Sequence, residues 1–185
     1  LGTVCDIMPL TDENRIFVKR GLRRLTNSTN LGINALKKAL GLDGKPIEVH
    51  HLSFRIGPSL NSTGRLESAK EGVELLLTDD PARAESLAQD MAKLNELRKE
   101  MTDRGVRAAT DWVRKDIRMI PTEDGVKEKK IGDDKVIVLY MPGIHESIAG
   151  LIASKLKEAF YRPTLVFTDA ENGHGPVSYT HLTLP

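Results

Sequence analysis

Residues 135–168 read KVIVLYMPGIHESIAGLIASKLKEAFYRPTLVFT, in which two apolar runs flank a segment of helical periodicity. The outer runs are short and rich in β-branched residues, which predicts two buried strands. The apolar stripe of the intervening helix consists of Ile148, Leu151, Ile152, Leu156, Ala159 and Phe160. A strand, a helix and a second strand in this order predict a βαβ unit with parallel strands. The fold class expected from this stretch is α/β.

A long helical segment precedes this unit. Asp80-Pro81 supplies an N-cap followed by a first-turn proline. The apolar positions that follow are Leu87, Met91, Leu94, Met101, Ala108 and Trp112. A helix continuous to about Ile117 would be roughly 50 Å long at 1.5 Å per residue. Arg98 and Gly105 interrupt the stripe where a coiled-coil seam needs apolar residues, so we expect a helix that packs on a domain at each end.

The remaining elements are assigned from periodicity and capping signals. LGTVCDIM (1–8) is interpreted as a buried strand, and residues 47–54 as a second strand. Helices are expected from Thr11 or Asp12 to about Leu25, from 31 to 40, and from 66 to 77. GVKEKKIGDDK (125–135) is expected to be a charged, solvated hairpin or linker. RIGPSLNSTGRL (55–66) is expected to be a long, tightly turning loop.

Composition restricts the function classes. Charged residues make up 29% of the chain while the net charge is +1, so any nucleic-acid contact must use a local patch rather than bulk charge. Aromatic residues make up only 4%, which limits base stacking. The single cysteine, Cys5, excludes an internal disulfide and is typical of a reduced thiol in the cytoplasm. No apolar run reaches membrane-spanning length, and no signal-peptide pattern is present.

Both ends of the sequence suggest a fragment. The chain starts at Leu1, without a methionine, inside an expected strand. From Gly173 onward the sequence shows neither helical nor strand periodicity. VSYTHLTLP (177–185) resembles a translated sequencing-adapter end, the alternative being a native tail. We therefore exclude it from fold reasoning, and His181 with it as a candidate ligand.

The loop 55–66 carries the most specific candidate chemistry. Arg55 and Arg65 can each donate two hydrogen bonds to phosphate oxygens. Asn61, Ser62 and Thr63 add neutral donors just before an expected helix N-terminus, which favours anions. A structural turn whose arginines pair with nearby carboxylates explains the same local features equally well.

Other candidate residues are less specific. Asp6 ends an expected strand and could bind Mg²⁺ or Mn²⁺, although a single carboxylate is more typical of a loop cap. His50 and His51 point to opposite faces of a strand and are interpreted as ordinary strand residues. Ser147 is expected to be the N-cap of the βαβ helix. His145 could contact a phosphate or hydrogen-bond the backbone.

Four blocks together resemble a known family. GTVCDIMPLTDENR, FRIGPSLNSTGRL, ELLLTDDP and HESIAGLIASKLKEAFYRPTLVFT are similar, in order and spacing, to the RecJ single-stranded-DNA exonucleases of the DHH phosphoesterase superfamily. The likeness extends over essentially all of residues 1–175.

The resemblance implies the C-terminal part of a DHH catalytic domain (1–80), a long connecting helix (81–117) and a truncated DHH-associated domain (118–175). Residues 176–185 are assigned to the adapter-like, non-native tail. The resemblance also implies 5′→3′ hydrolysis of single-stranded DNA, in repair and recombination, by a pair of Mn²⁺ or Mg²⁺ ions. Carried over by motif, Asp6 matches a catalytic, metal-binding aspartate. Arg65, Arg55 and Asn61 match the segment that holds the DNA phosphates. His145 and Ser147 are possible phosphate or supporting contacts.

The sequence departs from the family pattern in several places. Ser59 stands where many relatives have another arginine, which puts more weight on Arg65. The Asp-x-Asp and Asp-His-His motifs are absent, as are the Gly-Ser-Gly-Arg-Ser stretch expected near Gly175 and the later Gly-Gly-His motif. We therefore expect this chain alone to be inactive. Two alternatives stay open: a DHH-superfamily phosphoesterase acting on short oligonucleotides, and a non-catalytic nucleic-acid-binding module.

Overall fold

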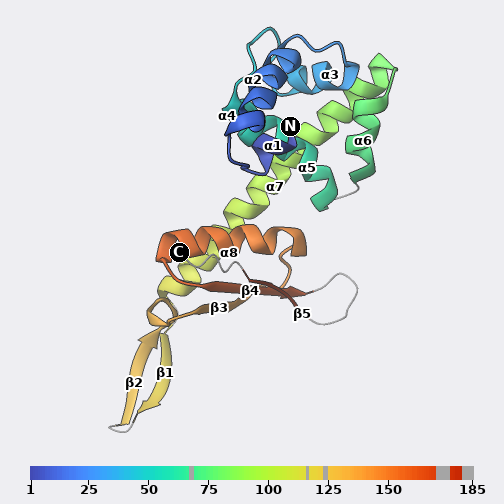
Figure 1. Ribbon diagram of the computed structural model, residues 1–185. Helices are drawn as coiled ribbons and strands as arrows, with labels where there is room; N and C mark the ends of the chain where they lie inside the picture. The colour runs from blue at the N-terminus through green and yellow to red at the C-terminus, as the bar shows by residue number, and fades with distance from the viewer. Residues whose placement is uncertain (67–68, 116, 123–124, 170–175, 181–185) are drawn as a thin grey trace. The chain divides into compact units, whose positions relative to one another are not determined.

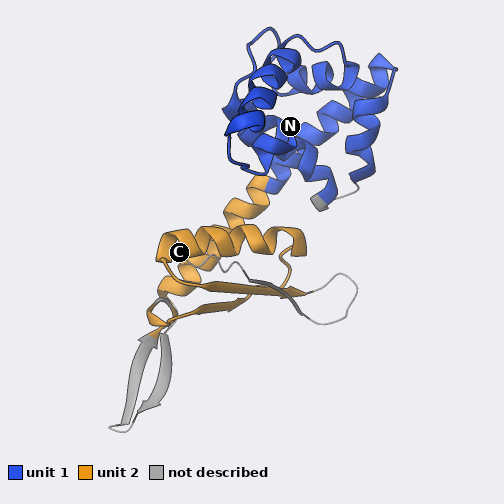
Figure 2. Ribbon diagram, in the orientation of Figure 1, with its two compact units in different colours: residues 1–98 blue, residues 99–185 orange. Residues whose placement is uncertain are grey.

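The computed structural model describes residues 1–66, 69–115, 117–122, 125–169 and 176–180. The side chains of 65, 66, 117–122, 125–129, 132 and 176–180 lie outside this description. The chain divides into two compact units, Leu1–Arg98 and Lys99–Pro185 (Figure 2). Together they form a chain of mixed helix and strand, which confirms the α/β class.

The described part of unit 1 is helical (Figure 1). In chain order its elements are α1 (Gly2–Cys5), α2 (Asp12–Thr26), α3 (Leu31–Ala39), α4 (Val49–His51), the π-helix η1 (Leu52–Ile56), α5 (Gly57–Leu66), α6 (Ala69–Leu77) and the first part of α7 (Pro81–Lys115). The helices expected near 12–25 and 31–40 are confirmed, and the third corresponds to α6, which is described from Ala69 to Leu77.

Two expected strands of unit 1 are wrong. Residues 2–5 form helix α1, and residues 49–56 form α4 and η1. Segments this short do not separate a helix from a strand by pattern, because neither completes enough turns to show a helical period. Capping adds a local reason at the second site, where Glu48 and His51 form a reciprocal capping box that starts α4.

Helix ends in unit 1 are satisfied by side chains from neighbouring elements. The Asn30 side chain accepts from the Ile33 amide at 2.9 Å and caps α3. The buried Lys37 ammonium donates to the carbonyls of Leu25 (3.2 Å) and Thr26 (2.9 Å) at the end of α2. These bonds hold α2 and α3 together where terminal carbonyls have no partner within the helix.

The core of unit 1 lies between these helices and the first half of α7. Its buried members are Val4, Leu36, Leu42, Ile47, Leu52, Ile56, Leu75, Leu87, Ala88 and Met91. Helices α3 and α6 touch backbone to backbone, because a Cβ on Gly32 would lie 1.8 Å from the Leu75 carbonyl oxygen. Only glycine permits this approach.

Helix α7 confirms the long helix expected from Pro81. Its first part contributes to the core of unit 1, and Ala109 and Val113 are buried in the core of unit 2. The expected positions Ala108 and Trp112 are exposed instead. A strict seven-residue repeat drifts by about 20° per heptad on a straight helix, so extrapolation from Leu87 misses the buried face by the third repeat.

Unit 2 contains the expected βαβ unit. Strands β3 (Ile137–Tyr140) and β4 (Thr164–Asp169) are parallel, with Ile137 opposite Thr164, and α8 (Glu146–Phe160) joins them. The core residues are Ala109, Val113, Ile131, Ile137, Leu139, Met141, Ala149, Ile152, Ala153, Leu156 and Val166. Gly105 of α7 approaches α8 closely, because an added Cβ would lie 2.4 Å from Cδ1 of Ile152. The glycine that interrupts the stripe of α7 in the sequence is therefore a packing contact.

Two further segments of unit 2 differ in detail from expectation. Strands β1 (Ile117–Thr122) and β2 (Gly125–Lys130) form an antiparallel hairpin, and a 3₁₀ turn (Ile131–Asp133) leads from it to β3. Residues 176–180, expected to lack periodic structure, form strand β5 (Pro176–Thr180) antiparallel to β4. The non-native origin of that tail and the four-part domain assignment stay predictions. None of the described helices is long and apolar enough to cross a membrane.

Candidate nucleic-acid interface

The segment RIGPSLNSTGRL is helical rather than a loop. It runs from the end of η1 through α5, and the Gly57 amide donates to the Leu52 carbonyl in π-helical register. Pro58 follows at once and has no amide to donate. Slippage of the hydrogen-bond ladder by one residue is the usual form of a π-bulge, and here it lets the helix continue past the proline.

The hydroxyl groups of α5 face inward. Ser59, Ser62 and Thr63 are all fully buried. Their hydroxyls donate to the carbonyls of Arg55 (2.8 Å), Ser59 (2.6 Å) and Leu60 (3.0 Å), respectively. The expectation that Ser62 and Thr63 donate to phosphate is therefore wrong, because both donors are already used and shielded from solvent.

Asp6 lies where α1 meets η1. A Cβ on Gly57 would sit 2.4 Å from Sγ of Cys5, so α1 packs directly on the start of α5. Burial raises the pKa of the Cys5 thiol, which lies 3.8 Å from the Leu52 carbonyl oxygen. The adjoining Asp6 is exposed and forms the C-cap of α1, not the end of a strand.

Of the three predicted phosphate ligands, the structure describes the side chains of Arg55 and Asn61. The exposed Arg55 donates through Nη2 to the carbonyl of Leu40, the C-cap of α3, which leaves its other donors available. Asn61 is exposed on α5 beside a pocket of about 450 Å³ that it lines with Gly64 and Gly72. The Arg65 side chain lies outside the described residues. Asn61 and Arg65 are four residues apart in one helix and therefore share a face.

His145, not Ser147, is the N-cap of α8. Its Nδ1 accepts from the Ser147 amide at 3.2 Å and lies 2.8 Å from the Ser147 hydroxyl. Histidine is uncommon as an N-cap, and the sequence pattern favours the serine two positions later. A pocket of about 310 Å³ opens beside this cap, lined in part by Arg104 and Gly143. His145 and Ser147 thus have a structural role, and their contact with phosphate stays a prediction.

The adjacent histidines belong to α4. His50 Nδ1 lies 3.3 Å from Glu48 Oε2, and His51 Nδ1 accepts from the Glu48 amide at 3.1 Å. The pKa of His51 is lowered by burial first and by His50 second. Their strand placement is wrong, and the hydrogen bond accepted by His51 helps to cap the N-terminus of α4.

The described residues do not build a metal centre. Nowhere among them do three His, Cys, Asp or Glu side chains come together as a possible metal site. Asp6 can supply one carboxylate, but a Mg²⁺ or Mn²⁺ pair needs several oxygen or nitrogen ligands. This part of the chain therefore does not by itself fit the two-metal centre expected from the resemblance.

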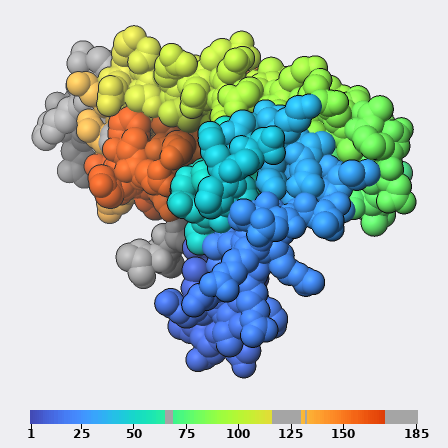
Figure 3. Space-filling view, turned by 90° about the horizontal axis from the view of Figure 1, so that it is seen from above, coloured from blue at the N-terminus to red at the C-terminus, as the bar shows by residue number. Residues whose placement is uncertain are grey.

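A basic face on α2 was not singled out from the sequence. Arg15, Lys19, Arg20, Arg23 and Arg24 are exposed on it. The sequence signal that could have indicated it is one arginine followed by two adjacent pairs of cations, at steps of four, one, three and one residues after the acidic first turn. Figure 3 shows the N-terminal residues in dark blue standing out from the rest of unit 1.

Comparisons with known proteins give one consistent result. No family model matches the chain. The single-stranded-DNA-specific exonuclease RecJ of Bacillus subtilis is 34% identical over 174 residues, 94% of this chain and 20% of that protein. RecJ of Escherichia coli is 34% identical over 174 residues, 94% of this chain and 28% of that protein. The chain therefore spans about a fifth to a little over a quarter of the length of these relatives.

Solved structures agree with the sequence comparison. RecJ of Thermus thermophilus in complex with Mg²⁺ has a TM-score of 0.72 and 32% identity, covering 90% of this chain and 24% of the other. An exonuclease RecJ bound to manganese has a TM-score of 0.73 and 32% identity, covering 90% of this chain and 38% of the other. In sequence and in fold, this chain is similar to a segment of the RecJ exonucleases, as its four motif blocks indicated.

Proposed function

We propose that this chain is a segment of a RecJ-type enzyme that hydrolyses single-stranded DNA from the 5′ end in repair and recombination. The observation that carries the proposal is that sequence and structure point to the same proteins. The chain is 34% identical to a RecJ sequence over 94% of its length, and its fold matches a RecJ structure with a TM-score of 0.73. Residues 1–80 then belong to the DHH catalytic domain, 81–117 to the connecting helix and 118–175 to the DHH-associated domain. We place the protein in the cytoplasm, which agrees with the unpaired Cys5.

In this proposal Asp6 is one ligand of a Mn²⁺ or Mg²⁺ pair that a longer protein completes. The Mg²⁺ and manganese bound in the similar RecJ structures support that choice. When bound, such a pair activates a water and stabilises the leaving oxygen of a phosphodiester. Asp6 is exposed, so its carboxylate can bind a metal ion together with ligands from outside this chain.

The chain alone is expected to show no Mn²⁺-dependent exonuclease activity, because one aspartate cannot organise two metals. Release of nucleotides from a 5′-labelled single strand by the purified chain, with and without Mn²⁺, measures this. Asp6→Ala is the matched control. Activity that the chain shows and Asp6→Ala loses would contradict the proposal that the metal centre is incomplete here.

Arg65, with Arg55 and Asn61, is proposed to hold DNA phosphates along α5. Arg65→Ala is expected to weaken binding of single-stranded DNA and to reduce its salt slope by about 0.7, the value for one phosphate contact. Fluorescence anisotropy in metal-free buffer at several salt concentrations measures both quantities. Lys93→Ala is the control, because Lys93 is exposed but already lies 3.5 Å from the Asp90 carboxylate. An unchanged slope in Arg65→Ala rejects this role.

A non-catalytic nucleic-acid-binding module is the second candidate for the chain by itself. The observation in its favour is that the described residues contain no three-ligand metal cluster. Binding that persists without metal, combined with absent hydrolysis, is the result expected of such a module. A phosphoesterase for short oligonucleotides has no comparable observation in its favour, because the similar proteins are named for single-stranded DNA.

A further inference from the structure

Helix α2 carries its cations on one side. With about 100° between successive residues, Arg15, Lys19, Arg23, Arg20 and Arg24 span half of the helix circumference. The opposite side holds the partly buried Val18, Leu22 and Leu25, which pack on the core of unit 1. We call the half that bears the five cations the basic face of α2.

The five cations of the basic face form no ion pair within the described part of the chain, and the carboxylates of α2, Asp12 and Glu13, lie in its first turn. All five side chains are exposed. Some exposed cations elsewhere present a contrast: Lys38 is paired with Glu85, Arg83 with Glu74 and Lys115 with Asp111. Five such cations on one helix concentrate positive potential in a chain whose net charge is only +1.

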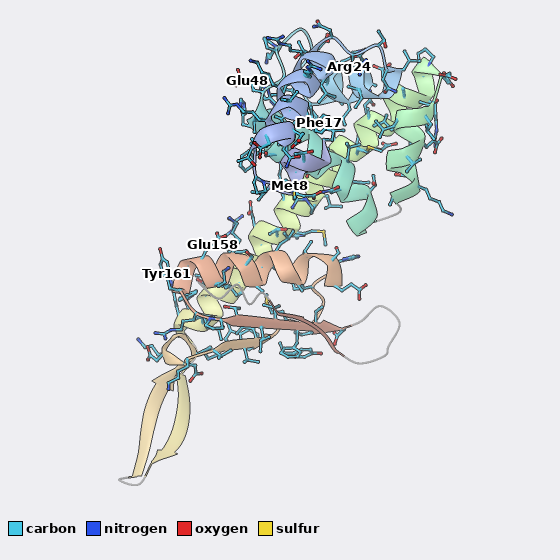
Figure 4. All side chains as sticks on the ribbon, viewed as in Figure 1. Met8, Phe17, Arg24, Glu48, Glu158 and Tyr161 are labelled. Carbon is cyan, nitrogen blue, oxygen red and sulfur yellow. The ribbon has the colours of Figure 1, made fainter. Side chains whose placement is uncertain are left out.

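An aromatic ring borders the same face. The side chain of Phe17 is 66% exposed, so its ring is accessible to a ligand (Figure 4). It precedes Arg20 by three residues and Arg24 by seven, so it lies along one edge of the basic face. An exposed ring next to these arginines can stack a nucleobase while the arginines contact the flanking phosphates.

We propose that the basic face of α2 is a second contact surface for single-stranded nucleic acid, separate from the phosphate contacts proposed for α5. The inference rests on the proposed function for its choice of substrate. From Arg15 to Arg24 the face is about 14 Å long at 1.5 Å per residue. A DNA strand presents one phosphate per about 3.4 Å along a duplex axis, and the phosphates lie farther apart in a stretched single strand. The basic face is therefore long enough to contact about two to four consecutive phosphates. Phe17 favours a nucleic acid over an acidic peptide, since a peptide backbone offers it no base to stack.

The test compares two fourfold variants of the whole chain with equal net charge. The first is Lys19→Gln, Arg20→Gln, Arg23→Gln and Arg24→Gln on the basic face. The control is Lys38→Gln, Arg83→Gln, Lys93→Gln and Lys115→Gln, which removes four cations that carboxylates already neutralise. Both sets are exposed, and circular dichroism checks that both variants keep the helical content of the parent chain.

Binding of a labelled oligothymidylate without metal is measured by anisotropy over a range of salt. The basic-face variant is expected to bind at least about tenfold more weakly, and its salt slope to fall by about 1.4 or more, which is about 0.7 for each of two or more phosphates. The control is expected to keep the affinity and slope of the parent. Phe17→Ala is expected to lose about fivefold in affinity with an unchanged slope, because stacking releases no counterions.

Other outcomes overturn the proposal. Equal loss in the two fourfold variants means that total charge, not the basic face, determines binding. Equal competition by an oligoglutamate of the same charge means that the face binds any polyanion. No detectable binding by the parent chain rejects the surface outright. If Arg65→Ala weakens binding while the basic-face variant does not, this inference fails and the proposed function stands. The reverse result keeps the basic face and removes the role of Arg65.

Discussion

Helices α5 and α8 both carry residues assigned to phosphate contact, and they are held in their units by different chemistry. The inner side of α8 is apolar throughout, with Ile148, Ala149, Ile152, Ala153 and Leu156 buried. The inner side of α5 is built from glycine and hydroxyl residues, and its hydroxyls donate to backbone carbonyls of the preceding turn. A serine bonded in this way packs like a small apolar residue, so a polar sequence can still form a buried helix face.

The largest effect is expected where packing depends on apolar volume. Ile152→Ala removes a fully buried side chain from the core of unit 2 and should lower the free energy of unfolding by about 3 kcal/mol. Urea denaturation followed by circular dichroism measures the loss. Leu151→Ala on the same helix is the control, since its side chain is only partly buried. Equal losses in the two variants would mean that buried apolar volume does not determine how α8 is held, and the contrast with α5 would fail.

A smaller effect is expected where α5 depends on close approach. Gly57→Ala places a Cβ 2.4 Å from Cys5 Sγ and 2.9 Å from the Leu52 carbonyl oxygen, which should cost about 2 kcal/mol through overpacking. Cys5→Ala removes the nearer atom, so the double variant should recover part of that loss. The same denaturation assay on all four proteins gives the coupling free energy. Strict additivity would show that α1 does not press on Gly57.

The smallest effect is expected from one hydroxyl of α5. Ser62→Ala removes hydrogen bonds to the carbonyls of Ser59 and Met91 and should cost about 1 kcal/mol. Ser154→Ala on α8 is the matched control, because Ser154 is only partly buried and is expected to change stability little. A loss in Ser62→Ala as large as that in Ile152→Ala would mean that hydrogen bonding, not small size, positions α5.

The same contrast explains which elements were predictable from the sequence. Strand β3 and helix α8 follow from apolar periodicity, because their buried sides are apolar. Strand β4 follows from its run of β-branched and aromatic residues, although Thr164 and Thr168 are buried on it beside Val166. Helix α5 is predicted as a loop, because its glycines, proline and serines are also the residues of turns. What converts them into a helix is the fit of Gly57 against Cys5 and of Ser62 against Met91, two contacts between distant parts of the sequence.

Candidate site residues were predictable to a lesser degree. The exposure of Asp6, Arg55 and Asn61 agrees with a role in binding, but exposure alone does not identify a ligand. The capping roles of His145 and Arg55 depend on where backbone groups lie in the folded chain, and residue spacing in the sequence does not predict this. The basic face of α2 is visible in the sequence, but a net charge of +1 hides a local excess of cations.

The π-helix before Pro58 amounts to a single-residue insertion in an otherwise regular helix. Deleting one residue between 52 and 56 would restore the ordinary ladder and turn everything after it by about 100°. The buried Ser59 and Ser62 would then turn away from the protein interior, and the exposed Asn61 would change its environment as well. Which residues of α5 are buried therefore depends on one extra amino acid. A change in the length of this segment should disturb the packing of α5 more than most substitutions within it.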